Sequence, residues 1–166
     1  MNYVIEYWSA IEEGKVIVSK RVYRQYKRLV DEINSPDKYV FDERKANKPI
    51  EFIERFCKHS KGEWAGKPVK LELFQKAYIA ALFGFINKET GLRRYRESLF
   101  YVSRKNGKTT MLAGLAAYML IADGEGGAEV YSIASKRDQA RILFDETHSM
   151  IQQSPNLSKH IKKRKS

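Results

Sequence analysis

The sequence predicts an α/β domain, with a parallel sheet flanked by helices, preceded by a mainly helical N-terminal region. Two short apolar runs, SLFYVS (98–103) and AEVYSIAS (128–135), have the composition of buried strands. Between them, residues 109–122 are apolar on all sides, which is typical of a helix packed within a core. A strand, a helix and a second strand in this order predict a right-handed parallel crossover.

The chain divides by pattern into a helical region at residues 1–60 and the beginning of the α/β domain at residues 61–166. The run NSPD (34–37) breaks the first region between its second and third helices. The three expected helices have apolar residues at three- and four-residue spacing and cover residues 3–11, 20–33 and 50–60.

Two further helices are expected in the second region. Residues 71–86 are a strongly apolar run that follows a turn containing Gly66 and Pro68. Apolar residues between 140 and 151 again recur at helical spacing. Ser135 and Asp138 have the spacing of a capping box, which predicts where this last helix begins.

The charge balance favours a polyanionic partner, either nucleic acid or an anionic membrane surface. The net charge is +11, from 31 Lys and Arg against 20 Asp and Glu. A basic helix around residues 21–28 offers contacts to DNA phosphates, although such a run is also typical of a solvated face. The longest apolar stretch, residues 111–122, is too short to span a bilayer, and no secretory signal is visible. The single cysteine, Cys57, predicts a buried thiol on a helix in a reducing, cytoplasmic compartment.

The segment SRKNGKTT (103–110) stands between the first expected strand and the apolar helix, where a phosphate-binding loop belongs. Gly107, Lys108 and Thr109 fit the second half of the G-x-x-x-x-G-K-[ST] pattern, whereas Val102 replaces its first glycine. Gly107 lets backbone N–H groups approach a phosphate, Lys108 reaches the β- and γ-phosphates, and the Thr109 hydroxyl ligates Mg²⁺. The predicted site for ATP and Mg²⁺ consists of Ser103, Arg104, Lys105, Asn106, Gly107, Lys108, Thr109 and Thr110.

The sequence alone does not decide the roles of two cations of this loop, Arg104 and Lys105. Arg104 can stabilise charge on a transferring phosphoryl group, as arginine fingers do. Arg104 and Lys105 are equally compatible with solvated loop charges, and the whole segment with a basic surface turn.

The loop resembles the deviant Walker A motif of phage terminase large subunits, the ATPases that drive DNA into viral capsids. In that family an Arg commonly occupies the position of Arg104, and the first glycine is commonly absent. GEWAGKPVKLELFQK (62–76) resembles the adenine-recognition segment of the family, and AEVYSIASKRDQARILF (128–144) its second strand and following helix. The likeness covers roughly residues 40–153.

The resemblance implies an ATPase whose catalytic residues are Lys108 and Arg104. The family's adenine-binding glutamine falls on Gln75, and Phe74 or Trp64 stacks on the base or packs in the core. It implies double-stranded DNA, the terminase small subunit and the portal protein as partners. It also implies a homo-oligomeric ring for the full-length protein, in the cytoplasm of the host cell.

The family's Walker B motif is four apolar residues followed by Asp-Glu at the end of a strand. In ILFDETH (142–148), Asp145 and Glu146 fall in the middle of an expected helix, and Arg141 interrupts the apolar run. VDE (30–32) and FDE (41–43) also lie in expected helical segments. We therefore expect the Walker B motif, the coupling segment and the nuclease domain beyond residue 166, and weak nucleotide binding and poor turnover by the isolated chain.

Two other interpretations stay open. One is another enzyme with a phosphate-binding loop, such as a helicase-like ATPase or a small-molecule kinase. The other is a non-enzymatic basic module that binds nucleic acid through residues 21–28, residues 93–96 and the tail KHIKKRKS. No carboxylate cluster predicts a nuclease. No zinc site is predicted, because ligand spacing is absent among Cys57, His59, His148 and His160.

Overall fold

The computed structural model describes residues 1–159, and the chain forms two compact units. The first unit contains Met1–Ile50 and Leu71–Phe100, and the second contains Glu51–Lys70 and the residues from Tyr101 onward. Helix α3 contributes residues to both units. The division of the chain at residue 60 stays a prediction. Except for Lys159, the basic tail lies outside the described residues.

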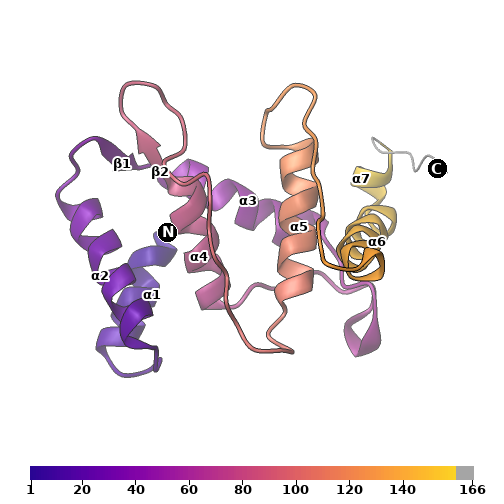
Figure 1. Cartoon of the computed structure of the whole chain (residues 1–166), viewed down its shortest axis with the longest axis horizontal. Coiled ribbons are helices and arrows are strands. Elements are labelled where there is room, and N and C mark those ends of the chain that lie inside the picture. The colour runs from indigo at the N-terminus through magenta and orange to yellow at the C-terminus, as the bar shows by residue number, and fades with distance from the viewer. Residues whose placement is uncertain (160–166) are drawn as a thin grey trace. The chain divides into compact units, whose positions relative to one another are not determined.

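The first unit is a helical assembly with one small sheet (Figure 1). Helix α1 packs against both α2 and α4. Strands β1 and β2 pair antiparallel, with Tyr39 opposite Asn87 and Phe41 opposite Phe85. The elements are α1 (Tyr3–Glu12), α2 (Lys20–Asn34), β1 (Tyr39–Phe41), α4 (Leu73–Gly84) and β2 (Phe85–Asn87), with the first part of α3 (Glu43–Phe56).

Local sequence sets where these elements begin and meet. The Asn2 side chain accepts hydrogen bonds from the N–H groups of Val4 and Ile5 and so caps α1. Helix α4 ends at Gly84, where a β-carbon would lie 2.5 Å from a ring carbon of Phe41. Only glycine therefore allows the end of α4 to approach β1 this closely.

The second unit is built on the packing of α5 (Lys108–Ile121) against α6 (Arg137–Gln153). A β-carbon on Gly114 of α5 would lie 2.9 Å from Cγ1 of Ile53, which is fully buried. The missing side chain thus lets α5 pack closely against the second part of α3. The unit also contains the short helices η1 (Gly62–Trp64) and α7 (Pro155–Ser158).

The expected strands at residues 98–103 and 128–135 are not formed in the described part of the chain, which has neither helix nor strand there. Leu99, Tyr101 and Ile133 are 88%, 96% and 91% exposed, although their apolar character predicts burial. A strand is stable only when a neighbour satisfies its backbone groups, and residues 1–159 provide no strand that pairs with either segment. The described architecture is therefore mainly helical, with one two-stranded antiparallel sheet.

Most of the predicted helices are confirmed. The expected helices at 3–11, 20–33, 71–86, 109–122 and 140–151 correspond to α1, α2, α4, α5 and α6, and the break at 34–37 is confirmed. Helix α3 begins earlier than expected and ends at Phe56, so Cys57 is buried but lies just outside the helix. The capping box at Ser135 is wrong, because α6 begins at Arg137 and the Ser135 hydroxyl donates to the Gln139 side chain.

Candidate functional site

The segment before α5 forms a tight exposed loop whose backbone turns sharply twice. Lys105 has φ +68° and Gly107 has φ +67°, both in the left-handed region. Glycine adopts this conformation without strain, whereas lysine does so at a cost. Left-handed residues at alternate positions bring neighbouring N–H groups toward one side of a turn, which is how backbone concavities bind anions.

Asn106 holds this loop in shape. Its Nδ2 atom donates to Oγ of Ser103 at 2.7 Å and also lies 3.3 Å from the Ser103 carbonyl oxygen and 3.2 Å from that of Arg104. Two of the predicted site residues, Ser103 and Asn106, therefore bond to each other across the turn. The sequence motif did not predict this internal bond.

Helix α5 begins directly after the loop, with Gly107 as its N-cap and no side-chain hydrogen bond to the first turn. The first four N–H groups of any helix lack partners within the helix, and the helix dipole makes this end positive. Lys108 and Thr109 are exposed here, and Thr110 is half-buried. The beginning of α5 is therefore free of a side-chain cap and accessible to an anion.

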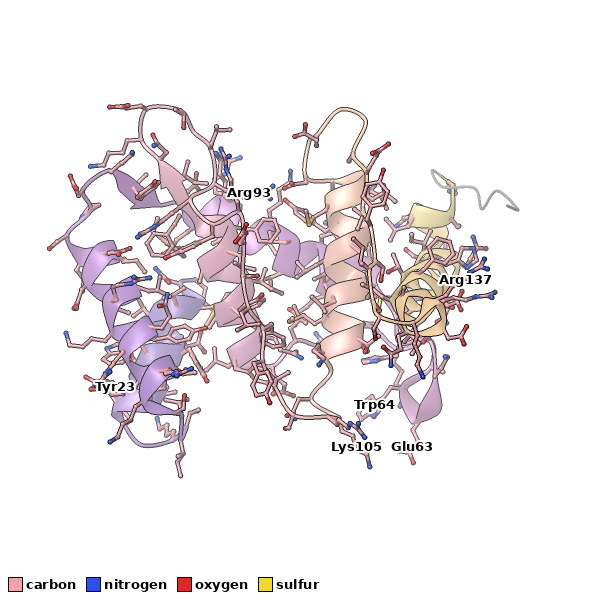
Figure 2. All side chains as sticks on the ribbon, in the orientation of Figure 1. Tyr23, Glu63, Trp64, Arg93, Lys105 and Arg137 are labelled. Atoms are coloured by element: carbon pink, nitrogen blue, oxygen red, sulfur yellow. The ribbon has the colours of Figure 1, made fainter. Side chains whose placement is uncertain are left out.

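Three cations surround this end of α5. Arg104, Lys105 and Lys108 are exposed, and within residues 1–159 none of them lies within 4.0 Å of a carboxylate. Figure 2 shows the Lys105 side chain extending outward from the loop. The site therefore combines unneutralised positive charge with backbone N–H groups, which together suit a phosphate group.

Gln75 lies in the first unit, at the first turn of α4, and is 5% exposed. Its Oε1 atom accepts a hydrogen bond from the backbone N–H of Glu72 at 3.0 Å, so the amide helps to cap α4. The loop belongs to the second unit, so contact of Gln75 with the same nucleotide stays a prediction.

The two aromatic candidates for base stacking have different surroundings. The Phe74 ring is parallel to that of Phe100, at an interplanar angle of 6° and a centroid separation of 6.4 Å. Trp64 is 60% exposed in the second unit, and the Lys67 ammonium lies 4.7 Å from the centre of its ring. Of the two rings, Trp64 is the more exposed, since Phe74 is half-buried.

The structure places Asp145 and Glu146 in the middle of α6, as their spacing predicts. Asp145 forms an ion pair with Arg141 at 3.4 Å, and Glu146 accepts a hydrogen bond from the Ser60 hydroxyl at 2.6 Å. The Ser60 contact joins residues 86 positions apart and has no signal in the sequence pattern. Neither carboxylate ends a strand, which a Walker B acid requires.

The expectation that residues 41–43 are helical is wrong at one point, because Phe41 ends β1 and Asp42 precedes α3. Oδ1 of Asp42 accepts the N–H of Lys45 at 3.0 Å, and the Glu43 carboxylate lies 3.1 Å from the N-terminal ammonium of Met1. Both carboxylates thus have local structural partners. Within residues 1–159, no group of three or more His, Cys, Asp or Glu side chains is arranged to hold a metal ion.

The sequence around this loop is similar to that of known proteins. The family model described as "Terminase large subunit, ATPase domain" matches residues 73–166. The terminase large subunit of Enterobacteria phage HK97 is 33% identical over 113 residues, which are 68% of this chain and 21% of that protein. No solved structure matches the chain.

The family match includes α4, the loop and α5, so the loop lies within the part of the chain that the family shares. The chain spans about a fifth of the length of its HK97 relative, as the coverage of 21% shows. Among the helices of the described residues, none has the length and apolar character needed to cross a membrane. Since the family model covers more than half of the sequence, the chain belongs to the terminase large subunit family and includes part of its ATPase domain.

Proposed function

We propose that the loop at residues 103–110 binds Mg-ATP, and that the chain is the ATP-binding portion of a motor that translocates viral DNA into a capsid. The observation that carries this proposal is the beginning of α5, a helix end with no side-chain cap, beside exposed cations that have no carboxylate partner among residues 1–159. Family membership supports the choice of ATP over another anion.

Each residue of the loop has a distinct proposed role. The Lys108 ammonium contacts the β- and γ-phosphates, while the Thr109 hydroxyl ligates Mg²⁺. Arg104 stabilises charge that develops on the transferred phosphoryl group. Lys105, Gly107 and Thr110 contribute backbone N–H groups, and Ser103 and Asn106 maintain the turn through their own hydrogen bond. Gln75 recognises the adenine edge.

The proposed architecture of the complete ATPase domain is a parallel sheet in which residues 98–103 and 128–135 become strands. Their exposed apolar side chains support this proposal, because burial against neighbouring strands would stabilise them. Hydrolysis also requires carboxylates that hold Mg²⁺ and orient water. Since Asp42, Asp145 and Glu146 each have a hydrogen-bond or ion-pair partner among the described residues, we expect the chain alone to turn ATP over slowly.

The proposed partners are double-stranded DNA, a terminase small subunit and a portal protein, with the full-length protein acting as a homo-oligomeric ring in the host cytoplasm. The net charge of +11 supports the DNA partner. A helicase-like ATPase is the second candidate, and strong stimulation of ATP hydrolysis by single-stranded DNA would favour it.

Calorimetric titration of the chain with Mg-ATP tests the nucleotide site. We expect Lys108→Ala to raise the Kd about 10- to 100-fold, because a hydrogen bond to a charged group contributes about 1.5–3 kcal/mol. Lys61→Ala, which removes an exposed lysine from the same unit, should leave the Kd unchanged. Equal affinity of the Lys108→Ala variant and the unsubstituted chain would overturn the proposal. Rapid hydrolysis that Lys108→Ala abolishes would instead assign Asp145 and Glu146 a catalytic role.

A further inference from the structure

Helix α2 has two faces of opposite character, and the first part of the basic one has no acidic partner within the described residues. On the inner face Tyr26 and Leu29 are buried, and the Tyr26 ring meets that of Tyr7 on α1 at a centroid separation of 4.7 Å. The outer face is exposed. We define the basic face of α2 as Lys20, Arg21, Arg24, Lys27 and Arg28.

These five residues lie on one side of the helix. At about 100° per residue, their positions fall within roughly a third of the helix circumference, and they extend over about 12 Å of its axis. Arg24 stands four residues from both Lys20 and Arg28. Like charges at this spacing repel each other and destabilise a helix, so an external anion would stabilise the arrangement.

The acidic residues of α2 neutralise only one end of the basic face. Asp31 pairs with Lys27 at 3.0 Å, whereas Glu32 lies 3.9 Å from Arg28 and forms its main ion pair with Arg94. Within residues 1–159, no carboxylate lies within 4.0 Å of the cationic group of Lys20, Arg21 or Arg24. The excess positive charge is therefore concentrated in the first two turns of the helix.

We propose that the basic face of α2 binds the phosphate backbone of double-stranded DNA without reading its sequence. The inference rests on the proposed function, which supplies DNA as the partner, and adds the surface that contacts it. A duplex presents one negative charge per about 1.7 Å of its axis, so a row of cations can neutralise several phosphates together. Phosphate contacts position a protein on DNA but do not distinguish bases.

The packing of α2 favours DNA over an anionic membrane surface, which is the other polyanion that its charge could attract. An amphipathic helix binds a membrane by inserting its apolar face into the lipid. In this chain α1 packs against the centre of the apolar face of α2, through Tyr7 against Tyr26 and Trp8 against Tyr23 at 4.9 Å, although Val22 and Tyr23 stay 36% and 39% exposed. Tyr26 and Leu29 are therefore not available for insertion into lipid, whereas the exposed basic face suits a charged polymer in water.

The test measures the affinity of the chain for a fluorescent 30-base-pair duplex over a range of salt concentrations. We expect the variant Lys20→Gln, Arg21→Gln, Arg24→Gln to reduce the slope of log K against log [salt] by up to about 2.7, which is 0.9 for each lost phosphate contact. The conservative variant Arg21→Lys, Arg24→Lys should retain the slope. Two duplexes of unrelated sequence should bind equally.

The matched control is Lys15→Gln, Lys38→Gln, Lys88→Gln, which removes the same charge from exposed positions outside α2 in the same unit. Its slope should fall clearly less than that of the α2 variant. Equal slopes for the two triple variants, or binding to vesicles of anionic lipid in place of DNA, would overturn the assignment. Circular dichroism and thermal unfolding verify that each variant is folded.

The two proposals fail in different ways. A wild-type slope in the α2 variant, together with nucleotide binding that depends on Lys108, would refute the DNA surface alone. Unchanged nucleotide affinity in Lys108→Ala, together with a reduced salt slope in the α2 variant, would refute the nucleotide site while the DNA surface stands. Failure of the unsubstituted chain to bind the duplex would refute the DNA surface directly.

Discussion

Helices α2 and α5 are similar in length, with 15 and 14 residues, but carry their chemistry in different places. Helix α2 places its cations along one side and caps its own N-terminus, where the Ser19 hydroxyl accepts the N–H of Val22 at 3.3 Å. Helix α5 is apolar along its length and has no side-chain cap at its beginning. Helix α2 thus presents its basic side to solvent, and helix α5 presents its N-terminal end.

The difference shows that an α-helix can bind a polymeric anion with its side or a compact anion with its N-terminal end. A long polymer needs several charges distributed along a surface, which the side of α2 provides. A triphosphate is compact and needs converging N–H groups and a few cations, which the loop and the beginning of α5 provide. Burial of the middle of α5 fixes this end in position, because Met111, Ala113 and Ala117 have no exposed surface.

The largest expected effect on stability is in α5. Gly114→Val places side-chain atoms where Ile53 already stands 2.9 Å from the β-carbon position, and overpacking of a core costs about 1–3 kcal/mol. Arg24→Ala on the exposed side of α2 should change the free energy of unfolding by less than about 0.5 kcal/mol. Denaturant titration measures both variants.

Cys57 provides a second readout in the unit that contains Gly114. Burial raises the pKa of its thiol to about 12, so at pH 8 the native thiol is almost entirely protonated and reacts slowly with an alkylating reagent. Gly114→Val should accelerate the alkylation by exposing Cys57 more often. Gly126→Val is the control, because a β-carbon at Gly126 meets nothing within 4 Å. Equal rates for the two variants would contradict tight packing at α5.

A smaller effect is expected at the beginning of α2. Ser19→Ala removes the side chain that accepts the N–H of Val22, and loss of such a cap costs about 1 kcal/mol. Ser19→Asp restores an acceptor and should recover most of that loss. Thermal unfolding of the three proteins measures the effect, and identical midpoints would show that α2 does not depend on its cap.

The smallest effect is expected at Lys105 in the loop. Lys105→Gly removes the strain of a left-handed lysine, about 1–2 kcal/mol, but adds freedom to the unfolded chain, which costs about 0.4–1 kcal/mol. The Lys105→Gly variant should therefore be more stable than the unsubstituted chain by about 0.5 kcal/mol. The Lys105→Ala variant keeps the left-handed strain and should gain nothing. A denaturant midpoint of Lys105→Gly below that of Lys105→Ala would contradict the loop conformation.

The sequence predicted what depends on local pattern. The periodicity of α1 and α2, the apolar run of α5 and the glycine at 107 are encoded in adjacent residues, so the helices and the loop before α5 were predictable. The strands at 98–103 and 128–135 were not, because a strand forms only with a partner that the described residues do not provide. The hydrogen bond between Ser60 and Glu146 could not be predicted from the sequence, because it depends on tertiary packing.

The most direct test of the nucleotide site is a ¹⁵N-resolved NMR titration of the chain with Mg-ATP. The account predicts shifts of the backbone amides of residues 104–110, no shifts in α2, and loss of the response in Lys108→Ala. Shifts confined to α2 or scattered over the basic surface would contradict it, as would an unchanged response in the Lys108→Ala variant.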